Sequence, residues 1–531
     1  MSQSKAIFFG VVLMALHLLC CLAVVQRSPA PKSTFHHFDQ QLLRYPFVFQ
    51  QVRKGVGSPI EDLLPMDVQD VEEWSWEQDI ETYKNSLPLY LIIPSVVPTM
   101  CGISLWTMRM SGVVTLLLSS FFLFDLTRKM TNRTSGMVAV FFFTMSPAVW
   151  QSILIPAPFL SVMLGVLFCL WTLWNSQFGL HLIWMTLSGI AFGVLPRFGE
   201  TAGDAIPPIL LVVPMIAMYL GTTMWRGGWK GVASTFWFLL PSWYLFPFAW
   251  LRRQMERYIW DEAHVASGNK SLFSEMYGEV FNLVQSLLMP SIFVLTLYAI
   301  WGVRRQRWQI IWLLSGVFVL FVSAVWSDKS YDYYLSSMVP ILMIIVGLNF
   351  AWDRKKYVYG LCAVISFGTW LTLRHWDIPA VQRNAPAIFL QDTGVGNWQA
   401  SPSRMFRHWR QVAVTSQPKR DEIARWLLRD EGRTLLDDLE ADTLVLVFDS
   451  PNSDVIQYIG SIIRPDILFH RSAIGYSQSM TKRLRQHYDK VYAMMSNSVQ
   501  YPCSLESGLT LKKSIRKAQD VCIWEIAGRS H

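Results

Sequence analysis

The sequence predicts a polytopic α-helical membrane protein with about eleven transmembrane helices and a C-terminal soluble α/β domain. Three observations lead to this fold class. Of the 531 residues, 52% are hydrophobic and only 16% are charged, whereas soluble domains carry about 25% charged residues. Apolar runs of about 17 residues or more recur along residues 1–374, which is nearly the length needed to cross a bilayer. Short loops in which arginine and lysine cluster alternate along the chain with loops of different charge.

The apolar runs are the predicted transmembrane segments. Residues 88–105 are also apolar, but three prolines interrupt them, which favours a re-entrant or surface-lying segment. The first run is not followed by a clear signal-peptidase site, so we interpret it as a retained span. The predicted spans are approximately residues 6–25, 107–126, 136–153, 158–175, 181–196, 205–222, 232–250, 286–302, 309–326, 334–351 and 357–373.

The basic loops predict the orientation of the chain. Arginine and lysine cluster near residues 128–133, 226–230, 304–307 and 354–356, and such loops stay on the cytoplasmic side. The long polar loops 26–106 and 251–285 and everything after residue 374 are then external. Membrane orientation accounts for the net charge of +8, so we expect a lipid bilayer as partner and no nucleic acid.

Residues 375–531 form the predicted soluble domain, and residues 1–374 the transmembrane domain. Residues 420–432 have helical spacing. Short apolar runs within 442–448 and 519–527 predict strands, and residues 453–469 predict a helix followed by a strand. The domain holds no glycine-rich phosphate loop. Cys503 and Cys522 both lie in it, and their spacing does not decide whether they pair.

Two external loops carry the groups that a transfer reaction from an anionic lipid phosphate would need. Asp39 follows the first span by a few residues, and Arg252 and Arg253 open the loop 251–285. Arginines hold a phosphate and stabilise it as a leaving group, while a carboxylate deprotonates the acceptor. The simpler alternatives stay open: Asp39 is also a good helix N-cap, and an arginine pair is a common end to a span.

Three motifs, in order, resemble the GT-C glycosyltransferases, closest to the branch of the protein O-mannosyltransferases and the lipid A aminoarabinose transferases. The resemblance covers about residues 1–350. Asp39 stands where that family has its first external acid. Segments 188–199 and 328–340 resemble later family motifs. The first motif lies in segment 85–147. The matching residues of the three segments are Pro88, Leu89, Tyr90, Gly102, Arg109, Ser146, Pro147, Arg197, Lys329, Tyr333, Tyr334 and Pro340.

The resemblance implies a function and a set of site residues. The protein would move a sugar from a polyprenyl-phosphate-linked donor to a glycan, lipid or protein acceptor on the external face. The membrane would be the inner (cytoplasmic) membrane of a bacterium, with residues 375–531 in the periplasm. No cofactor and no metal ligand are implied, although a divalent cation stays open. The implied residues are Asp39 as catalytic base, Arg197, Arg252, Arg253 and Lys329 as donor-phosphate ligands, and Tyr90, Tyr333 and Tyr334 as substrate contacts.

Two departures from the family pattern keep other functions open. Asp39 is followed by Gln40, so the usual acidic pair is reduced to one carboxylate. The place of a second external acid holds Ala157 and Pro158. A catalytically silent membrane scaffold of the same fold is therefore an alternative. A lipid-linked sugar transporter is another, although the sequence shows no inverted repeat and few intramembrane charges.

Overall fold

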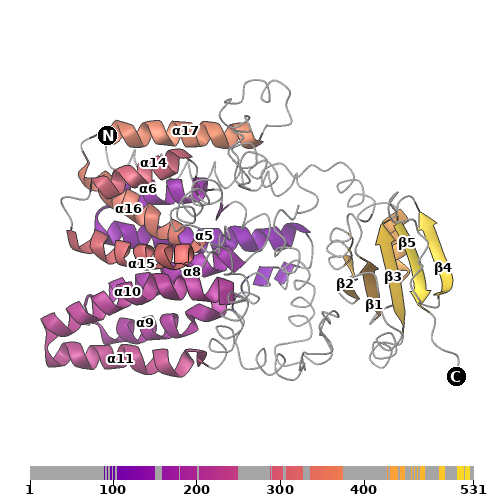
Figure 1. Cartoon of the computed structure of the whole chain (residues 1–531), viewed down its shortest axis with the longest axis horizontal. Coiled ribbons are helices and arrows are strands. Elements are labelled where there is room, and N and C mark those ends of the chain that lie inside the picture. Colours follow the sequence, from indigo (N-terminus) through magenta and orange to yellow (C-terminus); the bar gives the residue numbers. More distant parts are fainter. Residues whose placement is uncertain are drawn as a thin grey trace. The chain divides into compact units, whose positions relative to one another are not determined.

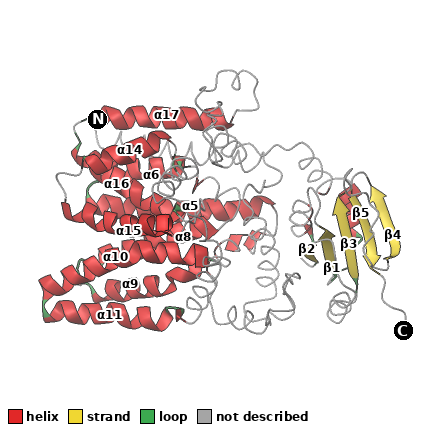
Figure 2. Ribbon diagram, viewed as in Figure 1, coloured by secondary structure: helices red, strands yellow, loops and turns green. Residues whose placement is uncertain are grey.

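The structure is a computed structural model of the whole chain. It describes residues 105–149, 158–248, 288–302, 307–326 and 335–374 with short gaps, and parts of 89–101 and 427–526. The chain divides into two compact units, one dominated by helices and one containing a sheet, and each is described by itself. Figure 2 shows the helices in red and the strands in yellow.

The first unit is a bundle of apolar helices (Figure 1). Each span predicted after residue 106 coincides with one of them, with η3 continuing α9 and η6 leading into α16. The span predicted at 6–25 lies outside the described residues. The helices are α5 (Leu105–Met130), α6 (Arg133–Met145), α8 (Pro158–Asn175), α9 (Leu182–Val194), η3 (Leu195–Phe198), α10 (Ala202–Gly227), α11 (Trp229–Leu245), α14 (Pro290–Trp301), α15 (Arg307–Trp326), η6 (Ser336–Met338), α16 (Val339–Trp352) and α17 (Lys356–Arg374).

Local signals fix several helix ends. The Asn132 side chain accepts a hydrogen bond from the Ser135 backbone N–H at 3.0 Å and so caps the start of α6. Ser146 ends the same helix and donates its hydroxyl hydrogen to the Phe142 carbonyl at 2.9 Å. Proline opens α8 and stands in the first turn of α16, where its missing N–H costs nothing. Ser146 and Pro340, two residues of the motifs quoted above, therefore stand at helix boundaries.

Helix length and composition separate two helices from the rest. Met110–Met130 and Ala205–Gly227 are long and apolar enough to cross a membrane, and the other apolar helices are shorter. On α10 and α11 the large apolar side chains that remain exposed include Trp225, Trp229 and Trp243. Exposed rings of this size on apolar helices are typical of a lipid-facing surface.

One end of the bundle collects positive charge, and we call it the basic end. The C-terminal parts of α5, α8, α10 and α16 lie here. Lys129 Nζ lies 2.6 Å from Asn175 Oδ1, Ser176 Oγ lies 2.9 Å from Tyr219 Oη, and Gly347 packs against Ser135 of α6. The first turns of α6, α11 and α17 follow directly in the chain. The cations located here are Arg128, Lys129, Arg133, Arg226, Lys230, Lys355 and Lys356.

The second unit contains a mixed five-stranded sheet with strand order β2-β1-β3-β5-β4. β1 pairs in parallel with β2 and β3, and β5 pairs antiparallel with β3 and β4. Val445 and Val447 of β1 are fully buried. The strands are β1 (Leu444–Phe448), β2 (Leu468–Ser472), β3 (Val491–Ser496), β4 (Leu511–Ala518) and β5 (Val521–Ile526).

The structure matches the sequence-based strands only in part. β1, β2 and β5 lie where strands are predicted, with β2 extending past residue 469. β3 and β4 are strands that the sequence analysis did not predict. β4 carries four lysines or arginines, and a segment of this composition resembles a solvent-exposed loop. The helix α21 (Glu431–Asp437) begins near the end of the predicted helical segment. Arg464 Nη1 donates to the Leu436 and Leu439 carbonyls and so caps the end of that helix.

Candidate functional site

Arg197 is the one predicted site residue whose side chain the structure describes. It lies in η3, directly after α9, at the end of that helix farthest from the basic end. Among bundle residues with described side chains, it is the one lysine or arginine located away from the basic end. The other predicted site residues lie outside the described residues: Asp39, Tyr90, Arg252, Arg253, Lys329, Tyr333 and Tyr334.

Two glycines of the predicted motif position Arg197. A Cβ on Gly189 would lie 2.2 Å from the Phe238 carbonyl oxygen of α11, and one on Gly193 would lie 2.9 Å from Leu245 Cβ. Residues four apart share a helix face, so these glycines let the backbone of α9 approach α11 closely. α9 and α11 are accordingly packed side by side (Figure 1). The close approach brings Arg197, the basic residue of the same motif, to Leu245 in the last turn of α11.

The Arg197 guanidinium is half-buried and incompletely hydrogen-bonded. Its Nη2 donates to the Leu245 carbonyl at 3.1 Å, one of the carbonyls that a helix C-terminus leaves without a helical partner. Its Nε is buried and has no hydrogen-bond partner. Buried polar atoms are nearly always paired in native proteins. The hydrogen bond to Leu245 gives Arg197 a structural role at the end of α11. The unpartnered Nε is a donor that could bind an acceptor such as a phosphate oxygen.

A second turn packs against the same helices as η3. Both η3 and η6 contact α8 and α10. Leu335, the residue directly after Tyr334 in the sequence, is buried at the start of η6. Ser337 is 1% exposed, and its hydroxyl oxygen has no hydrogen-bond partner. The structure therefore brings the end of the predicted tyrosine segment and the arginine turn to the same pair of helices.

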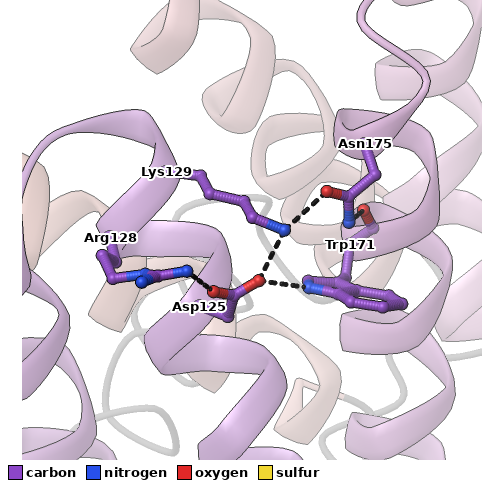
Figure 3. Close-up of polar contacts among 5 residues, drawn as sticks. All are labelled: Asp125, Arg128, Lys129, Trp171 and Asn175. Atoms are coloured by element: carbon purple, nitrogen blue, oxygen red, sulfur yellow. Dashed lines mark hydrogen bonds and ion pairs between the residues drawn. The ribbon is translucent and has the colours of Figure 1, made fainter.

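The basic end holds a polar cluster that the sequence analysis missed (Figure 3). Asp125 of α5 is 7% exposed. Its Oδ1 accepts from Arg128 Nη2 at 2.5 Å, and its Oδ2 contacts Lys129 Nζ at 2.7 Å and accepts from Trp171 Nε1 at 2.8 Å. Lys129 also donates to Asn175 at 2.6 Å and lies 5.3 Å from the Trp171 ring centroid. The cluster ties α5 to α8.

A local signal for this cluster was present in the sequence. Asp125, Arg128 and Lys129 follow the i, i+3 and i+4 spacing of helical ion pairs at the end of an apolar run. Within the described parts of the chain, no group of three His, Cys, Asp or Glu side chains is placed to hold a metal ion.

The apolar helical bundle and the mixed sheet together have a fold that is known from solved structures. One solved protein with a similar fold is ArnT from Cupriavidus metallidurans. Its crystal structure bound to undecaprenyl phosphate aligns with 98% of both chains at a TM-score of 0.56 and 12% identity. Its apo structure aligns over the same shares at a TM-score of 0.57 and 13% identity.

More distant comparisons add no argument about function. An apo oligosaccharyltransferase from Archaeoglobus fulgidus aligns with 92% of this chain and 70% of its own, at a TM-score of 0.44 and 9% identity. No protein-family model and no curated protein matches the sequence. The similarity to ArnT at this level of identity establishes the fold alone.

Proposed function

We propose that the protein is an integral membrane glycosyltransferase that moves a sugar from a polyprenyl-phosphate donor to an acceptor at the membrane surface opposite the basic end. The observation that carries this proposal is the charge distribution of the bundle. Among bundle residues with described side chains, seven lysines and arginines lie at one end and Arg197 lies at the other, half-buried and with an unpartnered Nε. A cation placed against the positive-inside trend, at a helix end, suits an anionic ligand.

The fold supports the choice of ligand. A solved protein with this fold binds undecaprenyl phosphate, and a polyprenyl phosphate of this kind is the donor carrier that we propose here. Arg197, Arg252, Arg253 and Lys329 would hold its phosphate and stabilise the charge that develops as the sugar leaves. Tyr90, Tyr333 and Tyr334 would contact the substrates. Asp39 would deprotonate the acceptor.

The membrane placement belongs to the same proposal. We propose eleven spans, with the basic end in the cytoplasm and residues 375–531 in the periplasm of a bacterium. The exposed aromatic residues of α11 support the embedding. Trp229 lies at its first position, and Trp243 lies 14 residues later, about 21 Å along a helix. This spacing suits rings at the two interfaces of a somewhat thinned or tilted hydrocarbon layer.

The decisive test uses the product rather than the protein. A strain lacking this chain should lose one glycosylated lipid, glycan or protein, and the wild-type chain should restore it, as measured by mass spectrometry of extracted lipids and glycans. Asp39→Asn should fail to restore it at normal membrane abundance. A scaffold role, which the single external acid favours, predicts instead that Asp39→Asn restores every product that the wild type restores.

A further inference from the structure

The turn between α5 and α6, at the basic end, carries more positive charge than the structure neutralises. Arg128, Lys129 and Arg133 lie within six residues, and Arg128 and Lys129 pair with the carboxylate of Asp125. Both oxygens of that carboxylate are already engaged by Arg128, Lys129 and Trp171 (Figure 3). Three cations against one carboxylate leave an excess of two positive charges at this turn.

Arg128 has an unused donor directed at no protein acceptor. One Nη atom binds Asp125, while Nε is buried and without a partner. The side chain as a whole is 37% exposed, so part of the guanidinium can still be reached from outside. A buried N–H without an acceptor is costly, and the donor fork of arginine matches the oxygens of a phosphate. The geometry thus suits an anionic group that bridges Arg128 to its surroundings.

The position of the turn selects the kind of anion. It ends the apolar segment Met110–Met130, and Trp171 and Trp184 pack edge to face beside it at 5.1 Å. Two further cations at the basic end lie over aromatic rings: Arg226 is 4.9 Å from the Phe178 centroid, and Lys356 is 5.1 Å from the Phe350 centroid. Cations and indole rings at the end of an apolar helix are typical of the lipid headgroup layer.

We propose that the α5–α6 turn is a binding site for the headgroup phosphate of an anionic phospholipid. Arg128 and Arg133 donate to the phosphate, and Lys129, held in place by Asp125, Asn175 and the Trp171 ring, adds charge beside it. The bound lipid then stabilises the junction of α5 and α8. This site lies at the opposite end of the bundle from the proposed donor site. It depends on the membrane embedding but not on glycosyl transfer.

The test uses the purified full-length chain in a neutral detergent. Phosphatidylglycerol should raise its unfolding temperature and remain bound in native mass spectrometry, whereas phosphatidylcholine and inorganic phosphate should do neither. Arg128→Gln should weaken phosphatidylglycerol binding about tenfold. Lys230→Gln is the matched control, because this exposed cation also lies at the basic end and should bind the lipid as the wild type does.

Two further variants keep the outcome decisive. Arg128→Lys keeps the charge but removes the Nε donor, so it should bind phosphatidylglycerol with an affinity between those of Arg128→Gln and the wild type. Arg133→Gln changes an exposed side chain and should also weaken phosphatidylglycerol binding. This variant tests the proposal if Arg128→Gln does not fold. Unchanged phosphatidylglycerol binding in both glutamine variants would overturn the proposal. Equal stabilisation by inorganic phosphate would overturn it in favour of a soluble anion.

Discussion

Arg197 combines a structural and a proposed binding role in one side chain, and the two roles separate in experiment. Arg197→Ala should weaken undecaprenyl phosphate binding by roughly 10- to 100-fold, the equivalent of about 1.5–3 kcal/mol for a lost charged hydrogen bond. Native mass spectrometry or a thermal-shift titration would measure it. Lys230→Gln, a cation at the basic end, should leave this binding unchanged. If Arg197→Ala lowers only the unfolding temperature, the residue caps α11 and does nothing more.

Asp39 is the second residue whose roles can be separated, and it lies outside the described residues. Asp39→Asn keeps the capping oxygen but removes the base, whereas Asp39→Ala removes both. A base predicts that both variants lose product at normal abundance in the membrane. A cap predicts that asparagine is tolerated and that alanine mainly lowers abundance, through a stability loss of about 1 kcal/mol. Product and abundance would be measured together by mass spectrometry and immunoblotting.

At the scale of elements, the contact between α9 and α11 places the arginine turn. Gly189→Ala should destabilise the protein by at least about 2 kcal/mol, because the added methyl group would overlap the backbone of α11. Gly221→Ala in α10 is the matched control, since a Cβ there meets nothing within 4 Å. It should be neutral or stabilising by up to about 1 kcal/mol, because alanine favours helix over glycine. Unfolding in detergent, followed by size-exclusion chromatography after heating, would compare them.

Equal thermal stability of the two alanine variants would contradict the close approach of α9 and α11. The Gly189→Ala variant also tests whether ligand binding at Arg197 depends on the packing of α9 against α11. If α9 and α11 must meet for Arg197 to reach Leu245, then surviving Gly189→Ala protein should bind undecaprenyl phosphate more weakly than Gly221→Ala protein does. Both variants keep Arg197, so a difference in binding between them would show that the position of Arg197 matters.

For the whole molecule, the charge asymmetry predicts the orientation in the membrane. A reporter that is active only in the periplasm should be active when fused after His531 and silent when inserted at Gly228, the exposed turn between α10 and α11. A reporter that is fluorescent only in the cytoplasm should give the opposite pattern. Positive loops remain on the cytoplasmic side, which is the physical basis of this expectation. Periplasmic activity at Gly228 would invert the proposed topology and place Arg197 on the wrong face.

Much of the bundle could be predicted because its signals are local. Apolar length sets where a helix forms, and residues such as Asn132, Ser146 and Pro158 set where it begins or ends. The same holds for β1 and β5, which are short runs of apolar and β-branched residues. β4 was missed because its lysines and arginines hide the strand, and its identity depends on pairing with β5.

The sequence by itself determined the helices, the segregation of basic residues to alternate loops, and Arg197 as a cation against that trend. The tertiary structure alone decided which helices meet. Gly189 lies against α11, and Lys129 finds Asn175 at a separation of 46 residues. The buried Asp125 likewise accepts a hydrogen bond from Trp171, which lies 46 residues away in the sequence. Helices that are apolar on all sides have no preferred face, so their partners follow from shape and polar pairing across the bundle, which no local pattern encodes.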